Sequence, residues 1–334
     1  MTVIMISTIR FPRATPGAPA TDSPAPANRE ELARWYGLMH LARLLDDKAP
    51  NYLKQSLGWS YHAPCAGHDG IQIALGVTFR SGHDYLFPYY RDLATCLAAG
   101  LSAEEILLNG MSKRDDVASG GRHMSNHFAK PAIHVQNVSS AVANHAQHAA
   151  GLARAVKTYG ADAVVFCSLG ESSTSEGYFY EAVNGASREK LPVVFVVQDN
   201  GYGISVPKSD QTANRFASDN FSGFRNLKIL HCDGTDLFDS LRALRAALPG
   251  EDFVYMADGA YAPYGERGDA FVADRSLSVS QQLQDAYGVK ALVVACNTAT
   301  ASAIALLRSA WPLLPIVGVE PALKPAAALT RTGR

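Results

Sequence analysis

Long apolar runs separated by polar clusters predict a parallel α/β fold in this chain. Residues 164–169 and 191–197 are continuously apolar and rich in β-branched side chains. Such runs are typical of strands buried on both faces of a parallel sheet. Between them, residues 172–175 are Ser and Thr, which are candidate N-caps for a helix from about Glu176. The pattern therefore predicts a strand–turn–helix–strand unit with polar residues at the carboxyl edge of the sheet.

Further elements extend this alternation along the chain. Helices are expected over residues 30–48 and 144–158. Two further helices are expected between them, one after a loop that begins at residue 61 and one that ends at Gly100. A strand and turn are expected over 227–236, and further strands over 253–257, 291–295 and 315–319. Another helix is expected to begin near Thr298, directly after Cys296.

The polar residues after the first two strands suggest a magnesium and phosphate site. Gly170 permits a sharp turn, Glu171 offers a carboxylate oxygen and Asn200 an amide oxygen, with main-chain carbonyls following near Tyr202. Magnesium completes such a ligand set with phosphate oxygens and water, and a helix N-terminus nearby attracts the same phosphates. On spacing alone, an ordinary βαβ unit with polar loops explains the pattern equally well.

Composition narrows the class of protein. The 334 residues carry 30 Lys and Arg against 31 Asp and Glu, so nothing indicates a nucleic-acid or anionic-membrane partner. No apolar run approaches the roughly 20 residues of a membrane span. Five scattered cysteines without CxxC spacing indicate reduced thiols and a cytoplasmic protein. Residues 1–28 are rich in Pro, Ala and Thr and are expected to form a disordered leader.

The central stretch resembles the thiamine-diphosphate motif. It begins as Gly170-Glu171-Ser172 and ends at Asp199-Asn200, with Ser172 in place of the motif's second glycine. The SEG at 175–177 and the DNGYGISVP at 199–207 more narrowly resemble the alpha subunit of 2-oxo acid dehydrogenases.

Other segments extend that resemblance over residues 30–239. Tyr90 and Arg91 resemble a pair that holds the diphosphate, and an arginine fork suits phosphate geometry. The GGRHMSNH at 120–127 resembles a loop that places His127 near the active site. The VSSAVA at 138–143 resembles the segment that contributes Ser140 to the cofactor site.

The resemblance implies a thiamine-diphosphate-binding fold and oxidative decarboxylation of a 2-oxo acid. It implies a hetero-oligomer with a beta subunit, and a lipoyl-bearing acyltransferase that accepts the acyl group. It assigns magnesium to Glu171, Asn200 and the Tyr202 carbonyl, and a catalytic role to His127. The diphosphate would be held by Tyr90, Arg91, Ser140, Gly170 and Ser172.

From residue 241 onward the chain resembles another family, the amino-terminal half of glutamate racemase. The PYG at 263–265 and the ACNTAT at 295–300 carry this second resemblance. A thiol at the start of a helix favours the thiolate, so Cys296 is a candidate proton-abstracting base. The resemblance assigns substrate binding to Tyr264, Gly265, Asn297 and Thr298.

The two resemblances imply a fusion of a truncated dehydrogenase domain over 29–240 with a partial α/β racemase-like domain over 241–334. The joint falls within 237–246, where leucines keep helical spacing. We expect 2-oxo acid decarboxylation impaired by the truncation, because the family's gating-loop histidine is missing. The alternatives are cofactor-independent racemase activity through Cys296 and an inactive fusion product. The racemase would lack the second cysteine that inversion at Cα requires.

Overall fold

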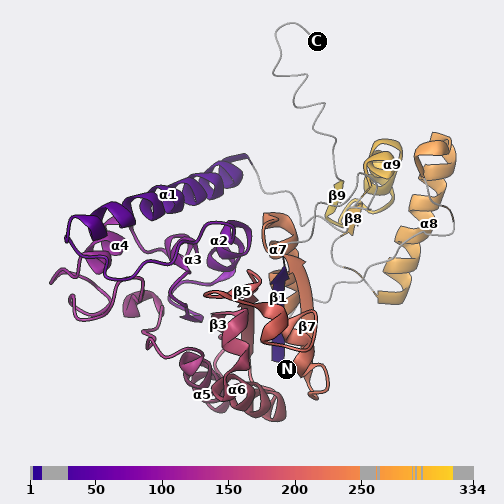
Figure 1. The fold of residues 1–334 in the computed structure, drawn as a ribbon. Helices are drawn as coiled ribbons and strands as arrows, with labels where there is room; N and C mark the ends of the chain where they lie inside the picture. The colour runs from indigo at the N-terminus through magenta and orange to yellow at the C-terminus, as the bar shows by residue number, and fades with distance from the viewer. Residues whose placement is uncertain are drawn as a thin grey trace, which may run out of the picture. The chain divides into compact units, whose positions relative to one another are not determined.

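The computed structural model describes residues 3–9, 29–248, 261, 264–287, 289, 292–294 and 296–318 (Figure 1). These residues divide into two compact units. The first contains residues 3–9 and 29–248, and the second contains the described residues from 261 to 318. Residues 241–248 therefore belong to the first unit, beyond the limit of 240 expected from the sequence.

The first unit is built on a five-stranded sheet with the strand order β2-β3-β4-β1-β7. Every pairing in this sheet is parallel. The strands are β1 (Val3–Ile9), β2 (Tyr85–Phe87), β3 (Val165–Gly170), β4 (Val193–Gln198) and β7 (Leu227–Asp233). The predicted α/β class with a parallel sheet is confirmed.

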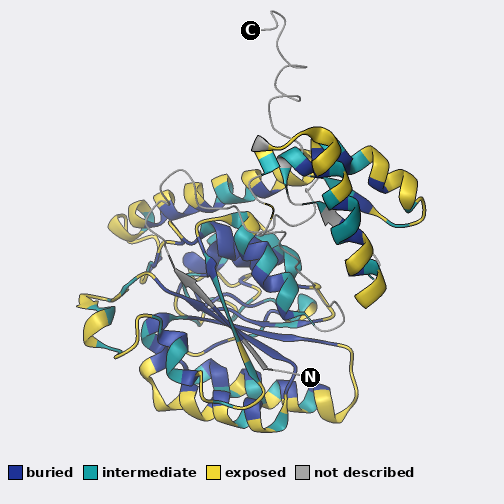
Figure 2. Ribbon diagram, turned by 90° about the vertical axis from the view of Figure 1, so that its right-hand side faces the viewer, coloured by how far each residue is buried: buried dark blue, intermediate teal, exposed yellow. Residues whose placement is uncertain are grey.

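Helices cover both faces of this sheet (Figures 1 and 2). One face carries α5 (Asn144–Thr158) and α6 (Gly177–Glu189), which pack against each other. The other carries α2 (Asp69–Thr78), α3 (Leu93–Ala99) and α7 (Leu237–Ala247), and α1 (Arg29–Lys54) and α4 (Ala103–Gly110) lie beyond them. The result is a three-layer α/β/α arrangement.

Strand β3 shows why this sheet needs cover on both sides. Val165, Cys167 and Leu169 belong to the core that α5 and α6 complete. Phe166 points to the opposite layer, where its ring lies 6.5 Å from that of Phe79 at the end of α2. Burial of alternate residues on both faces explains the continuous apolar run, and Figure 2 shows the sheet as buried.

Strand β1 corrects the prediction of a disordered leader over residues 1–28. It lies between β4 and β7, with Met5 opposite Phe195 on one side and opposite Ile229 on the other. Met5 and Ile6 are fully buried. The strand's partners lie about two hundred residues further along the chain, so local composition does not reveal the pairing. Residues 10–28 lie outside the described residues.

The connection between β3 and α6 also differs from the prediction. A 3-10 turn, η2 (Glu171–Ser175), precedes α6, and the N-cap is Glu176 rather than one of the Ser or Thr residues. Gly170 has φ −79° and ψ 160°, an extended conformation open to other residues. The turn at this point therefore does not depend on glycine's conformational freedom.

Glycine is required where α2 meets the turn after β7. The Ile71 backbone N–H donates a hydrogen bond of 2.9 Å to the Gly234 carbonyl. A Cβ on Gly70 would lie only 2.7 Å from the same oxygen. The close approach ties the amino end of α2 to the edge strand of the sheet.

A buried polar network joins α2 and α3 to the ends of β3 and β4. Gln72 Nε2 donates to Gln198 Oε1 at 2.9 Å, and Gln198 Nε2 donates to Asp92 Oδ1 at 2.6 Å and to Ser168 Oγ at 2.8 Å. Asp92 also accepts from the Tyr89 N–H at 3.0 Å. Burial raises the pKa of the Asp92 carboxyl to about 6.

The second unit is smaller and packs two helices against a two-stranded sheet. It contains η5 (Tyr264–Glu266), α8 (Asp269–Tyr287), β8 (Leu292–Val294), α9 (Asn297–Ala310) and β9 (Ile316–Gly318). The two strands pair in parallel. Its core is formed by Leu283, Leu292, Ala303, Leu307 and Ile316. The strand predicted over 253–257 lies outside the described residues.

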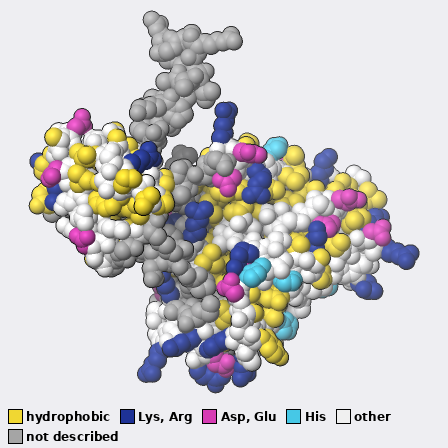
Figure 3. All heavy atoms as spheres, turned by 180° about the vertical axis from the view of Figure 1, so that it is seen from behind, with side chains coloured by type: hydrophobic (Ala, Val, Ile, Leu, Met, Phe, Trp, Pro, Cys, Tyr) yellow, Lys and Arg dark blue, Asp and Glu magenta, His cyan; other side chains and the backbone are white. Residues whose placement is uncertain are grey.

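The character of the helices and the charges on the surface both bear on the class of protein. In the part of the chain that the structure describes, none of the helices combines the length and apolar character needed to cross a bilayer. On the face shown in Figure 3, acidic side chains lie interspersed among basic ones. This distribution agrees with the net charge of −1.

We predict that β1 contributes substantially to the stability of the first unit. Ile6→Ala removes buried apolar volume from the middle of the sheet and should lower the free energy of unfolding by about 2–5 kcal/mol. Urea denaturation followed by the fluorescence of Trp35 and Trp59, both buried in the first unit, measures this in a Trp311→Phe background. Tyr36→Ala, at a side chain 71% exposed, is the control and should change stability by less than about 0.5 kcal/mol. Equal unfolding midpoints for the two variants would show that β1 is dispensable.

We also predict a pH-dependent stability contribution from Asp92. Its pKa is about 6 in the folded protein against 3.8 for an ordinary Asp, so folding favours the protonated carboxyl. The contribution is fully present below about pH 4 and is lost as the pH rises through 6, a total of about 3 kcal/mol. Asp92→Asn should therefore gain stability relative to the unmodified chain between pH 4 and 7. Urea midpoints of both proteins across this range test the sign, and parallel pH profiles would contradict it.

Candidate functional site

The carboxyl ends of β3 and β4 bring the predicted metal ligands together. Gly170 and Gln198 are register partners in adjacent parallel strands, so the residues that follow them leave the sheet at the same edge. The Asn200 backbone N–H donates to Glu171 Oε2 at 3.3 Å. Two segments almost thirty residues apart in sequence thus meet at the predicted place.

Glu171 is a buried carboxylate that forms no ion pair within the described part of the chain. The Ser172 hydroxyl donates to its Oε1 at 3.2 Å. Burial raises the pKa of the Glu171 carboxyl above its ordinary value, and the neighbouring Asp199 carboxylate adds to the rise. A cation bound here would compensate a negative charge that the protein leaves buried.

Asn200 and Tyr202 begin the loop that follows β4. Asn200 Oδ1 accepts a hydrogen bond of 2.9 Å from the Tyr202 N–H, which leaves its second lone pair for another partner. Tyr202 opens a short hairpin of β5 (Tyr202–Gly203) and β6 (Val206–Pro207). A Cβ on Gly203 would lie 2.5 Å from Ser172 Oγ, so this hairpin packs closely on the turn that carries Glu171.

The loop after β2 supplies Tyr89, Tyr90 and Arg91. Arg91 Nη1 donates to the Pro64 carbonyl at 2.9 Å, whereas its buried Nε lacks a hydrogen-bond partner in the described structure. Tyr89 is not among the residues that the sequence pattern indicates. Its ring lies against Gly170, and its buried hydroxyl likewise has no partner in the described structure. Two buried donors without partners in one loop, one of them on a ring that lies against Gly170, match a site that receives an anion.

His127 and Ser140 form a hydrogen-bonded pair. His127 Nδ1 donates to the Ser125 carbonyl at 3.2 Å, so Nε2 accepts from the Ser140 hydroxyl at 2.8 Å. His127 is buried, and burial lowers its pKa, which keeps the ring neutral. Ser140 is exposed at the protein surface. Among the described residues, no hydrogen bond or ion pair joins this pair directly to Glu171.

Asn126 connects the loop of His127 to the loop of Arg91. Its side-chain amide donates to the Tyr90 carbonyl at 3.1 Å, and its Oδ1 accepts from Trp59 Nε1 at 3.1 Å. Asn126 has φ +65°, a conformation that asparagine tolerates better than most residues. The positive φ is not visible in the sequence, so this positioning contact is not among the predicted ones.

In the second unit, Cys296 is the N-cap residue of α9 and is half-buried. The helix begins at Asn297, close to the predicted start, and η5 with Tyr264 and Gly265 packs against it. The predicted placement of Cys296 between a strand end and a helix start is confirmed. The other four cysteines are buried, free thiols, as expected for small apolar side chains.

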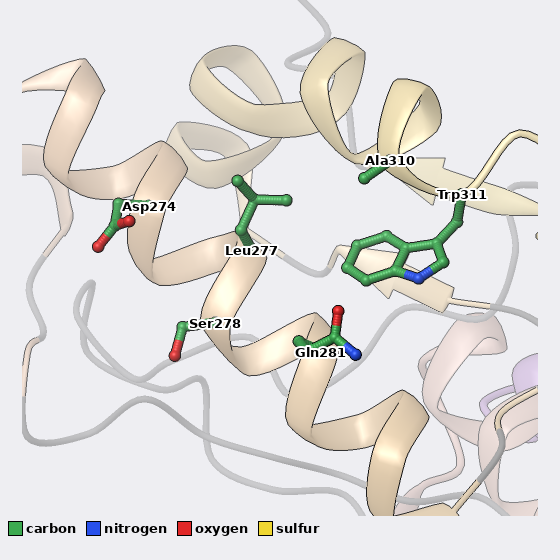
Figure 4. Close-up of a pocket in the computed structure, with 6 residues that line it drawn as sticks. All are labelled: Asp274, Leu277, Ser278, Gln281, Ala310 and Trp311. Atoms are coloured by element: carbon green, nitrogen blue, oxygen red, sulfur yellow. The ribbon is translucent and has the colours of Figure 1, made fainter.

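A shallow pocket of about 310 Å³ lies elsewhere in the second unit (Figure 4). It is lined from α8 and from the end of α9 by Asp274, Leu277, Ser278, Gln281, Ala310 and Trp311. None of these is a residue predicted to bind an amino-acid substrate, so the pocket does not support that role.

Comparison with known proteins separates the chain into two segments. Residues 36–249, more than half of the chain, match the family described as dehydrogenase E1 component. The chain is 33% identical over 218 residues to the 2-oxoisovalerate dehydrogenase subunit alpha of Bacillus subtilis (strain 168), covering 65% of this chain and 66% of that protein. The chain therefore spans slightly less than two thirds of this relative.

A separate segment is similar to glutamate racemases. It is 53% identical over 93 residues to the enzyme of Ectopseudomonas mendocina (strain ymp), covering 28% of this chain and 35% of that protein. It is 55% identical over 92 residues to the enzyme of Cupriavidus pinatubonensis, covering 28% and 33%. Both resemblances inferred from the motifs are confirmed, as the fusion requires. Through the segment that builds its first unit, the chain belongs to the dehydrogenase E1 component family.

Proposed function

We propose that the first unit is the cofactor-binding part of a thiamine-diphosphate-dependent 2-oxo acid dehydrogenase alpha subunit. The observation that carries this proposal is the buried Glu171 carboxylate, which meets Asn200 at the shared edge of β3 and β4. Family membership supports the same function. When bound, thiamine diphosphate would supply the carbanion chemistry that decarboxylation of a 2-oxo acid requires.

The residues present fit a magnesium ion bound together with a diphosphate. Glu171, Asn200 and the Tyr202 carbonyl would hold the metal, with the remaining ligands from phosphate oxygens and water. No three His, Cys, Asp or Glu side chains gather into a metal site within the described residues. One carboxylate with amide and main-chain oxygens suits a magnesium ion that shares its ligands with a phosphate, rather than an all-protein metal cage.

The diphosphate would be held by Tyr90, Arg91, Ser140, Gly170 and Ser172. The buried Arg91 Nε and the Tyr89 hydroxyl both lack partners, and a phosphate oxygen would satisfy such donors. Ser172, which replaces a glycine of the motif, turns its hydroxyl toward Glu171. His127 would hold the Ser140 hydroxyl in place through the 2.8 Å hydrogen bond and, as a neutral ring, accept a proton at Nε2.

The proposal includes a beta subunit, since the Bacillus subtilis relative is named as a subunit alpha. The assembly would transfer the acyl group to a lipoyl-bearing acyltransferase. We propose that turnover is strongly reduced, because the dehydrogenase-like segment ends before the expected gating-loop histidine. Loss of a positioned acid–base group typically costs about 10²–10⁴-fold in rate.

The main prediction concerns cofactor affinity. Glu171→Ala and Asn200→Ala should each weaken binding of thiamine diphosphate with magnesium by at least about 100-fold, because the metal loses a ligand. Titration calorimetry in the presence of a beta subunit measures the affinity.

The matched control for that titration is Glu176→Ala. This residue is an exposed glutamate five positions further on, and its side chain caps no backbone group of α6. It should bind the cofactor like the unmodified chain. Unchanged affinity in both the Glu171 and the Asn200 variant would refute the assignment of the site.

A second candidate function is proton abstraction from an amino acid by Cys296, supported by its position as the N-cap of α9. The segment covers only 35% of the Ectopseudomonas mendocina racemase, and inversion needs a base on each face of Cα. We therefore predict no racemisation. We also expect no exchange of the α-proton, because the segment matches only about a third of the racemase that would form the substrate site. Proton NMR of L- and D-glutamate in D₂O should show no loss of the α-proton signal beyond that seen with Cys296→Ala. Exchange that depends on Cys296 would establish the second unit as catalytically competent.

A further inference from the structure

Lys208 lies at the base of the loop that carries Asn200 and Tyr202. Its Nζ is 2.6 Å from Asp199 Oδ2. The Asp199 side chain is 2% exposed and that of Lys208 20% exposed, so this ion pair is largely shielded from water. An ion pair in such surroundings is screened less than a surface pair.

Lys208 also closes the loop through its backbone. Its N–H donates to the Gly201 carbonyl at 2.9 Å, and the Gly201 N–H donates to Asp199 Oδ1 at 2.9 Å. Lys208 therefore closes the loop that begins at Asp199 through two contacts, one from its side chain and one from its backbone. The partners of these contacts, Asp199 and Gly201, are the two neighbours of Asn200, the predicted metal ligand.

The ion pair changes the charge at the candidate site. Glu171 and Asp199 are both buried, and each lies beside Asn200, one through a hydrogen bond and the other along the chain. With Lys208 the three side chains sum to −1, and without it the two carboxylates sum to −2. A charge of −2 attracts a divalent cation more strongly but also repels a diphosphate more strongly.

We propose that Lys208 is a positioning and specificity-determining residue that makes the site accept magnesium together with a diphosphate rather than the metal alone. The inference rests on the proposed function and adds a residue outside the predicted site. Lys208 acts through Asp199 by setting the local charge, because its side chain compensates one of the two buried carboxylates beside Asn200.

The test measures two affinities in Lys208→Met. Binding of Mn²⁺ alone, followed by electron paramagnetic resonance, should become about tenfold tighter. Binding of thiamine diphosphate at saturating Mg²⁺, followed by calorimetry with a beta subunit, should become about tenfold weaker. A purely structural role in the loop would weaken both, so the opposite signs identify the charge effect.

Two companion variants isolate that charge. Asp199→Asn combined with Lys208→Met returns the sum to −1 and should restore both affinities to within about threefold of the unmodified chain. Lys208→Arg keeps the positive charge and should behave likewise. Lys130→Met is the control, because Lys130 is 23% exposed, close to the 20% of Lys208, and forms a 2.8 Å ion pair with Glu105. It should leave both affinities unchanged.

The outcomes separate the two proposals. If the unmodified chain binds neither probe, the proposed function is wrong. If it binds both probes and Lys208→Met weakens both or changes neither, the charge role of Lys208 is wrong while the cofactor site stands. Opposite changes that the double variant reverses would confirm it.

Discussion

The candidate site depends on the parallel pairing of β3 and β4 inside a sheet that is covered on both faces. Neighbouring strands lie about 4.8 Å apart, so Gly170 and Gln198 end their strands side by side and deliver Glu171 and Asn200 to one edge. A shift of one residue in this register would turn every side chain of the shifted strand to the opposite face. The apolar residues of both strands oppose such a shift, and the hydrogen bonds from Gln198 to Ser168 and Asp92 fix the same register from the polar side. The geometry of the site is therefore a consequence of how the core is packed.

The contrast between satisfied and unsatisfied polar groups marks where that core ends and the site begins. Beneath the site, Gln72, Gln198 and Asp92 exchange hydrogen bonds within a fully buried network. In the candidate site itself, the Tyr89 hydroxyl and Arg91 Nε are buried without a partner in the described structure, and Glu171 lacks an ion pair there. Unpartnered buried groups destabilise a protein, and proteins keep them mainly where a ligand completes them. Residues 89–92 form one loop that contributes Asp92 to the buried network and Tyr89 and Arg91 to the candidate site. The network that stabilises the fold therefore also positions these two donors.

Sequence patterns predict the parts of this structure whose causes are local. Helix α5 matches its predicted range, and strands β3 and β4 lie within two residues of theirs, because burial on both faces and helical periodicity leave clear signatures. The meeting of Glu171 and Asn200 at one edge of the sheet is predictable because each residue lies within two positions of the end of such a strand. Strand β1 is missed because its partners are remote in sequence. The unpartnered hydroxyl of Tyr89 and the contacts of Asn126 are not predicted, because burial of a hydroxyl and a positive φ appear only in the folded chain.

Helix α7 (Leu237–Ala247) covers the residues where the sequence motifs predict the joint between the two resemblances, and it belongs to the first unit. The Asp236 side chain caps it through hydrogen bonds to the N–H groups of Phe238 and Asp239, and Leu241 and Leu244 are buried. The helix packs on α2, which the close contact at Gly70 already ties to the end of β7. A helix at this position needs only a cap and apolar residues at helical spacing, and many sequences supply both. The cap and the apolar spacing together are therefore enough to explain the helix over residues 237–247. The chemistry of the second unit has no such tolerance, because proton removal and delivery need bases placed on opposite faces of one carbon atom.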